Sequence, residues 1–434
     1  MLTTAIIAVI TFLLLTLSIL FFPSVKIGKI RLDTYWCVAL LGALVLLFTG
    51  LTPASHIWNE LNSHTAINPI KILVLFFSMT FLSVFLDEVG FFRYLAKTAA
   101  RSAGKNQIKL FIILYILTSV LTVFTSNDII ILTLTPFICF FCKHTNVDPV
   151  PYLVGEFAAA NTWSMMLMIG NPTNIYLATS AGIGFTEYLK VMLLPTLAAG
   201  LVEFLLIILL FYKKLKKELQ PEEDDFRIRS KPELVTGLLH LFVCLVFLVV
   251  SSYIHVEMWL VSAVCAASLL LFALIFCFIS KDNTKYITHS LKRLPWQLIP
   301  FVLSMFVIVI CLNYQGISEH LGDLLGDRGA VWTYGFSSFL SANIINNIPM
   351  SILYSTLPSG LLQADYYRAI YASIVGSNIG AFLTPIGALA GIMFTGLTER
   401  YKVNYGFKKF IEYGAVTAIP TISAALTVLW FVLK

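Results

Sequence analysis

The sequence predicts an all-α polytopic membrane protein made of two inverted repeats, each with about five transmembrane helices and one re-entrant hairpin. Three observations predict it: the composition, the distribution of Lys and Arg, and polar strings at matching places in the two halves. The 434 residues are 58% hydrophobic and only 12% charged, and the mean hydropathy is +0.87. Because a soluble domain carries about 25% charged residues, the chain reads as a bundle of membrane helices.

The apolar runs divide into two sets of seven, separated by a polar linker at 213–233. The first repeat, 1–212, contains the runs 2–22, 34–52, 71–86, 107–125, 129–142, 151–180 and 188–212. The second repeat, 234–434, contains the runs 234–254, 256–279, 296–313, 331–345, 349–357, 366–396 and 407–433. The first run lacks a basic start and a small-residue cleavage site, so we expect a retained helix and not a signal peptide.

The positions of Lys and Arg favour one topology. If 107–142 is a hairpin entering from the cytoplasm and 331–357 one entering from outside, the cytoplasmic segments are 23–33, 93–109, 143–150, 213–233, 281–295 and 398–409. These segments hold 24 of the 29 Lys and Arg residues, as the positive-inside rule requires. The odd number of spans per half inverts the second repeat. The N-terminus is then extracytoplasmic, and the location is the inner or plasma membrane.

Polar strings lie where each hairpin turns. The first tip carries Ser126, Asn127 and Asp128, and the second carries Asn346 and Asn347. Hairpin tips expose helix ends and backbone carbonyls, which bind ions. Asp128 is the strongest candidate for coupling, because a carboxylate inside the membrane is costly. An Asp that only caps the following helix is the alternative.

Each half also contains a helix that Gly and Pro interrupt at mid-depth, at 151–180 and 366–396. Non-helical backbone survives there only where it is buried in protein or lines a cavity. The residues that satisfy or replace the freed backbone groups are Asn171, Thr173 and Asn174 around Pro172 in the first half, and Asn378 and Thr384 before Pro385 in the second. Asn161 aligns with Asn378. A simple proline kink is the alternative.

The remaining acids and cysteines are weaker candidates. Glu156 lies five residues before Asn161 and is a second coupling candidate, with an interfacial position as the alternative. We expect Asp87 and Glu88 to be solvated at the end of a span. Glu203 and Glu412 suit a structural pair or an interfacial position. Cys139 and Cys142 could share a helix face, but buried small hydrophobes explain them more simply.

Several function classes are excluded. The chain has no Walker-type loop, no nucleophile elbow and no HExxH motif, so no enzyme is expected. No Cys/His spacing suggests zinc or haem, and no cofactor is expected. The net charge of +6 is explained by the cytoplasmic loops and needs no nucleic acid. Energy must come from an ion gradient, the membrane potential or a separate ATPase.

These motifs resemble the ion transporter superfamily, which includes arsenite-efflux (ArsB-type) permeases, NhaD-type sodium/proton antiporters and divalent-anion/sodium symporters. Thr125-Ser126-Asn127-Asp128 with Leu134-Thr135-Pro136, and Asn346-Asn347-Ile348-Pro349, resemble the two hairpin signatures of the arsenite-permease/anion-permease branch. Ser377-Asn378 and Leu383-Thr384-Pro385-Ile386-Gly387 resemble its second broken helix. The chain departs from arsenite permeases at Asn161, where they tend to carry Asp. The resemblance implies a scaffold plus a transport domain, often as a homodimer.

The sequence therefore predicts a secondary active transporter of a small anion, oxyanion or its neutral acid, of the arsenite/antimonite type, with an elevator-type mechanism. Protons or sodium would couple transport, through Asp128 and Glu156. A sodium ion is expected at Ser126, Asn127, Asn171, Asn347 and Asn378. The alternatives are a sodium/proton antiporter, a sodium-coupled di- or tricarboxylate transporter, and a permease subunit that docks a soluble ATPase on 213–233.

Overall fold

The computed structural model describes the chain except for residues 23, 28–29, 63–67, 219–229, 255 and 281–284. Most of the predicted linker therefore lies outside the described residues. The described part is almost wholly helical, as the composition predicts. One exception was not predicted: β1 (Ser24–Ile27) and β2 (Ile30–Asp33) form a short antiparallel pair in which Ser24 is opposite Asp33.

Each predicted apolar run contains one or more of the helices. In the first half they are α1 (Leu2–Phe21), α2 (Thr34–Thr49), α3 (Ala54–Leu61), α4 (Pro69–Glu88), α5 (Phe91–Ala103), α6 (Gln107–Phe124), α7 (Asn127–His144), α8 (Val150–Trp163), the 3₁₀ turn η1 (Met168–Gly170), α9 (Pro172–Ser180) and α10 (Phe185–Leu215). In the second half they are α11 (Lys231–Ile254), α12 (Met258–Ser280), α13 (Lys285–Lys292), α14 (Leu298–Tyr314), α15 (Ile317–Leu325), α16 (Ala330–Ile345), α17 (Asn347–Tyr354), η2 (Leu357–Gly360), α18 (Gln363–Gly380), α19 (Leu389–Arg400) and α20 (Phe407–Val432). Four shorter helices, α3, α5, α13 and α15, lie outside the predicted runs.

Eight of the described helices are long and apolar enough to cross a membrane: α1, α4, α6, α7, α10, α11, α12 and α20. The two predicted hairpins differ in size. The arms of the first, α6 and α7, have 18 residues each, whereas the arms of the second, α16 and α17, have 16 and 8. Each arm of the first hairpin thus has the length and composition of a full span, and its re-entrant character stays a prediction.

The order of elements from α4 to α10 recurs from α14 to α20. In both series a long helix ends at a glycine with positive φ, Gly90 (φ 91°) or Gly316 (φ 70°), and a short amphipathic helix follows. Glycine suits this place because it has no Cβ to clash in the left-handed conformation. A helix pair broken at a polar tip comes next, and then a helix that stops at an interruption. The inversion of one half relative to the other stays a prediction.

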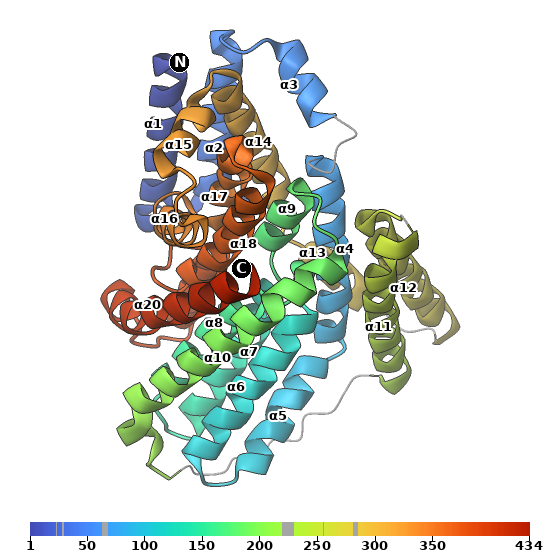
Figure 1. Ribbon diagram of the computed structural model, residues 1–434. Helices are drawn as coiled ribbons and strands as arrows, with labels where there is room; N and C mark the ends of the chain where they lie inside the picture. The colour runs from blue at the N-terminus through green and yellow to red at the C-terminus, as the bar shows by residue number, and fades with distance from the viewer. Residues whose placement is uncertain (23, 28–29, 63–67, 219–229, 255, 281–284) are drawn as a thin grey trace.

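The helices form two groups that meet in the middle of the molecule (Figure 1). One group contains α1, α2 and α14–α17, and the other contains α5–α8 and α10; α18 and α20 cross between them, and α11 and α12 pack beside α4. The most extensive contact between two helices is that of α16 with α18. A Cβ on Gly376 would lie 2.5 Å from the carbonyl oxygen of Gly335, so only glycine permits this approach.

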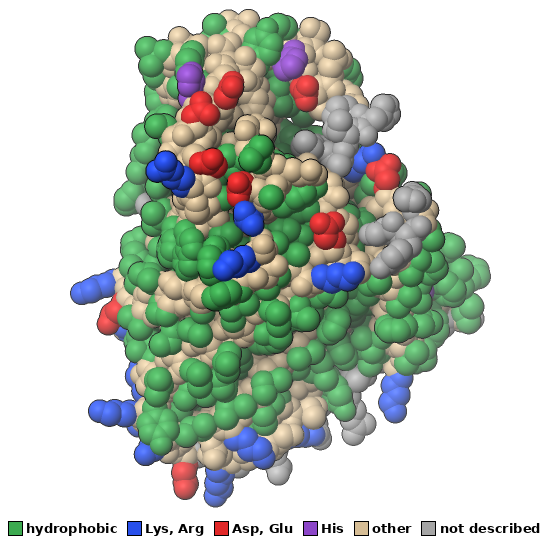
Figure 2. All heavy atoms as spheres, in the orientation of Figure 1, with side chains coloured by type: hydrophobic (Ala, Val, Ile, Leu, Met, Phe, Trp, Pro, Cys, Tyr) green, Lys and Arg blue, Asp and Glu red, His purple; other side chains and the backbone are tan. Residues whose placement is uncertain are grey.

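Contacts between connecting segments follow the predicted sides. Asn106 pairs with Glu218, and Lys214 lies 2.7 Å from Asp148; all four belong to segments predicted to be cytoplasmic. At the other end, the Met1 amino group donates to Gln315 at 2.7 Å. Figure 2 shows Lys and Arg side chains along the lower edge of the molecule, below a broad hydrophobic belt. Which end faces the cytoplasm stays a prediction.

Candidate substrate and ion site

The first interruption is built by Asn171 and Pro172. Proline is favoured at the first position of a helix because its missing N–H is not needed there, and α9 begins at Pro172. The Asn171 side chain caps this helix by accepting from the Thr173 N–H at 3.1 Å. Gly170 packs against the end of α8, where a Cβ would lie 2.2 Å from the carbonyl oxygen of Ser164.

The second interruption, at 381–388, is held by the tip of the second hairpin. The Asn346 amide donates to the carbonyl of Ile386 at 2.9 Å, and the Asn347 N–H donates to the carbonyl of Gly387 at 3.0 Å. The Thr384 hydroxyl donates to Asn343 at 2.7 Å. The backbone groups that the broken helix exposes are therefore satisfied by amide side chains and backbone of the hairpin, as buried polar groups require.

Asn378 is the centre of a buried network that joins the two halves. Its Oδ1 accepts from the Ser164 hydroxyl at 2.9 Å and from the Asn171 amide at 3.1 Å. Its Nδ2 donates to Asn174 Oδ1 at 2.6 Å. At the preceding position, the Ser377 hydroxyl donates to Thr173 at 2.9 Å. The sequence predicted Asn171, Thr173, Asn174 and Asn378 as site residues, and the structure places them together; Ser164 and Ser377 are additional members.

The first hairpin tip connects to this network through Asn161. The Asn127 amide donates to Asn161 Oδ1 at 3.1 Å, and the Ser164 hydroxyl donates to the carbonyl of Asn161 at 2.7 Å. The hydroxyl of Ser126 is buried, and the described residues offer it no hydrogen-bond partner. Asn346, Asn347 and Thr384, by contrast, form the separate cluster at the second interruption.

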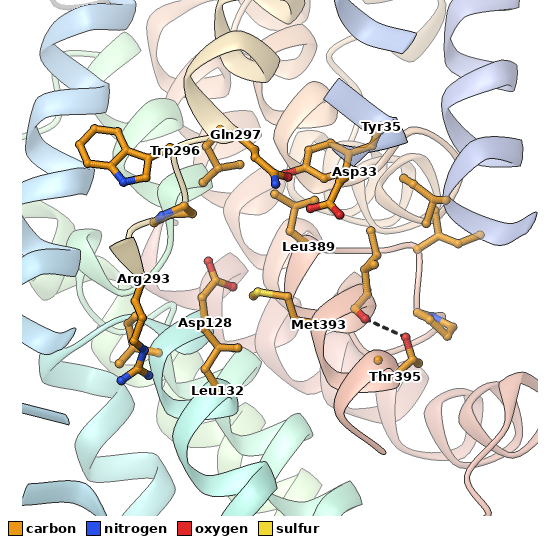
Figure 3. A pocket seen from close by; sticks show the side chains of 18 of the residues that line it. Asp33, Tyr35, Asp128, Leu132, Arg293, Trp296, Gln297, Leu389, Met393 and Thr395 are labelled. Atoms are coloured by element: carbon orange, nitrogen blue, oxygen red, sulfur yellow. Dashed lines mark hydrogen bonds between the residues drawn. The ribbon is translucent and has the colours of Figure 1, made fainter. Parts of the chain in front are cut away.

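Asp128 faces away from the amide network, into a cavity of about 640 Å³ that we call the Asp128 cavity. Figure 3 shows its carboxylate pointing into this space from the start of α7, with Met393 of α19 on one side and Arg293 on another. No described residue makes a hydrogen bond to the carboxylate, whereas the backbone N–H of Asp128 donates to Asn127 Oδ1 at 2.9 Å. Asp128, at the tip of the first hairpin, therefore links the amide network to the Asp128 cavity.

The far wall of the Asp128 cavity was not predicted from the sequence. Tyr35 at the start of α2 and Gln297 before α14 line it, and the Tyr35 hydroxyl reaches Gln297 at 3.5 Å. Asp33, Trp296 and Glu399 also line the cavity. The available signal was a Gln at the start of an apolar run, two residues after Pro295. Only the folded chain brings these segments beside Asp128.

The other acids take three different positions. Glu156 is 2% exposed, and its carboxylate accepts from the Thr135 hydroxyl at 2.9 Å. Glu203 is fully buried, and it accepts from Tyr115 at 3.0 Å and from Thr162. Glu412 is exposed.

The expectation that Asp87 and Glu88 are solvated is wrong. Their side chains are only 10% and 14% exposed, and both pair with Arg293. The charge pattern could not predict this, because Arg293 follows 205 residues after Glu88. Cys139 and Cys142 are buried and free, and no group of three metal-ligating His, Cys, Asp or Glu residues occurs among the described residues.

Comparison with known proteins agrees with this architecture. The model of the citrate transporter family, CitMHS, matches residues 34–376. This chain belongs to that family. Members of the citrate transporter family are membrane transport proteins, so the chain is a multi-span membrane transporter.

Curated relatives extend the match to nearly the full length. The arsenical pump membrane protein of Escherichia coli is 26% identical over 409 residues, covering 90% of this chain and 92% of its own. The putative arsenical pump membrane protein of Bacillus subtilis is 25% identical, covering 91% and 93%. The fold is similar to that in the crystal structure of the Alcanivorax borkumensis YdaH transporter, which is described as having an unusual topology. The TM-score is 0.53 at 14% identity, and the match covers 99% of this chain and 97% of that one.

Proposed function

We propose that this chain is a secondary active transporter of arsenite or antimonite, carried as the small neutral trihydroxy acid or its anion. Protons drive it through Asp128, by an elevator-type alternating-access movement. The names of the Escherichia coli and Bacillus subtilis relatives, which match about nine-tenths of this chain, support the substrate class.

The observation that carries the proposal is the chemistry of the buried network. Its members are amides and hydroxyls from α7, α8, α9 and α18: Asn127, Asn161, Ser164, Asn171, Thr173, Asn174, Ser377 and Asn378. Groups that both donate and accept suit an uncharged polyhydroxy acid. A multiply charged anion would need compensating cations, because burying unpaired charge is costly.

The lone pairs of the network favour a proton over sodium as the coupling ion. The side-chain oxygens of Asn171 and Asn378 each already accept two hydrogen bonds. Sodium at these two residues would have to displace such bonds, whereas Asp128 has an unshared carboxylate in an open cavity. Of the predicted sodium ligands, the unpartnered Ser126 hydroxyl fits best.

Carboxylate transport is the second candidate, favoured by the citrate transporter family match and by Lys292 and Arg293 on the cavity wall. Because Arg293 is held by Asp87 and Glu88, only Lys292 is available in this conformation without breaking an ion pair. This is why we rank carboxylates below the neutral metalloid acids.

The test is uptake into proteoliposomes under an imposed pH gradient, with arsenite, antimonite, citrate and sodium measured separately against protein-free vesicles. Gradient-dependent flux of arsenite or antimonite supports the proposal. Flux of citrate alone would replace the metalloid by a carboxylate. Sodium moving against protons with no anion flux would establish the antiporter alternative, and flux that requires an added ATPase would establish the subunit alternative.

A further inference from the structure

Arg293 lines the Asp128 cavity, and its two acidic partners line a second cavity. The Asp128 cavity is lined by Asp128, Leu132 and Arg293. A second cavity of about 510 Å³, which we call the Asp87 cavity, is lined by Asp87, Glu88 and again Leu132. Residues of α7 from Leu132 to Phe140 border the Asp87 cavity. The two spaces therefore follow one another along α7, with Leu132 at the junction.

An ion-pair cluster stands at this junction. Arg293 Nη2 lies 2.6 Å from Asp87 Oδ2, and Nη1 contacts Glu88. His289 of α13 approaches the same Glu88 carboxylate at 2.8 Å. The Arg293 side chain is 25% exposed and the two acids are less so. Because the cluster is partly buried, it is screened less than a surface pair, and it ties the α13–α14 connection to the end of α4.

Asp128 offers Arg293 another partner. Figure 3 shows the Arg293 side chain beside those of Asp128 and Leu132, and all three line the Asp128 cavity. No hydrogen bond to the Asp128 carboxylate comes from the described residues, whereas Arg293 already serves two acids. A charged carboxylate without a cation is unfavourable at this depth. The guanidinium can bind either set of oxygens, because it presents several donors in a fixed fork.

We infer that Arg293, Asp87 and Glu88 form an ionic gate between the Asp128 cavity and the Asp87 cavity, and that Arg293 exchanges Asp87 and Glu88 for Asp128 when the route along α7 opens. In the conformation described here the gate is closed. Arg293 is a positioning residue: it controls the passage and needs no contact with substrate. The inference rests on the proposed function only in taking the Asp128 cavity as part of the transport route.

The first experiment locks the gate. Asp87→Cys and Arg293→Cys are combined in one variant, which is reconstituted into proteoliposomes. A short bifunctional methanethiosulfonate then cross-links the two thiols, and reductant removes the cross-link. We expect the lock to abolish most of the flux and reductant to restore it. The matched control joins Asp148→Cys to Lys214→Cys, an exposed pair at 2.7 Å against 2.6 Å for Asp87 and Arg293, and should retain its flux. Wild type treated in parallel corrects for Cys37, the half-buried natural cysteine.

Flux that survives the lock would overturn the gate. The substrate is identified with the cross-link removed by reductant. If the reduced protein carries citrate and not arsenite, the metalloid proposal fails, and the effect of the cross-link is then measured on citrate flux. A second set of variants keeps the test valid if the double-cysteine variant misfolds. Arg293→Gln should give several-fold more flux without a gradient than wild type. Arg293→Lys keeps the charge but loses the fork of donors, so its gradient-free flux should lie between those of wild type and Arg293→Gln. Equal behaviour of the Gln and Lys variants would contradict the inference, because a purely structural arginine has no reason to control leak.

Discussion

Asn378 Nδ2 donates to Asn174 Oδ1 at 2.6 Å, across 204 residues of sequence. This bond joins α18 of the second half to α9 of the first, and both side chains are fully buried. Each amide also makes further bonds: Asn378 Oδ1 accepts from Ser164 and Asn171, and Asn174 Nδ2 donates to the Ser164 carbonyl. The two broken helices are therefore held in one arrangement.

Asn378→Ala is expected to abolish transport and lower stability. The change leaves the Asn171 Nδ2 and the Asn174 Oδ1 without the partner that Asn378 supplies, at about 1–3 kcal/mol for each unsatisfied group, whereas the Ser164 hydroxyl keeps the Asn161 carbonyl. Flux in proteoliposomes and thermal unfolding in detergent measure the two effects. Asn62→Ala is the control, because Asn62 is exposed and, among the described residues, its side chain donates to the Trp58 carbonyl one helical turn away. Wild-type flux in Asn378→Ala would remove the network from the site.

Asp128→Asn is expected to uncouple transport from the pH gradient. The amide keeps the shape of the side chain and cannot take up a proton, so any remaining flux should no longer respond to an imposed gradient. Uptake with and without the gradient measures this response. Asp148→Asn, at an exposed acid, serves as the comparison and should behave as wild type. Full, equally pH-dependent transport by Asp128→Asn would show that the coupling group lies elsewhere, with Glu156 the next candidate.

Gly170→Ala is expected to destabilise the first interruption by about 1–3 kcal/mol, the usual cost of overpacking. The new methyl would lie 2.2 Å from the Ser164 carbonyl oxygen, which also accepts from Asn174 at 2.9 Å. Gly360→Ala adds the same methyl in open space and should leave the unfolding temperature unchanged. Equal unfolding temperatures for the two variants would mean that the backbone around Gly170 adjusts freely.

Substitutions at Asn346 should separate backbone strain from hydrogen bonding. Its φ of 72° and ψ of 153° fall in a region that essentially only glycine adopts easily. Asn346→Gly loses the bond to the Ile386 carbonyl but relieves the strain, whereas Asn346→Ala loses the bond and keeps the strain. We therefore expect the Ala variant to be less stable than the Gly variant by about 1–3 kcal/mol. Chemical or thermal unfolding of the pair measures the difference, and an Ala variant as stable as the Gly variant would contradict it.

Much of the candidate site could be predicted because helix breakers and amides are rare in apolar sequence. Gly170-Asn171-Pro172 and Asn346-Asn347 stand out for that reason, and the structure places helix ends at both. Tyr35 and Gln297 could not be found in the same way. Tyr and Gln are common at the start of an apolar run. Their place in the site follows only from the folded chain, in which they line the same cavity as Asp128.

The sequence by itself determined that this protein is a helical membrane transporter with polar interruptions in both halves, because hydropathy and helix-breaking residues act locally along the chain. Only the tertiary structure decided which polar groups meet. It joined Asn174 to Asn378, paired Arg293 with Asp87 and Glu88, and left Asp128 facing a cavity. Hydrogen bonds and ion pairs act over a few ångströms, and helix packing alone brings residues 200 positions apart within that reach.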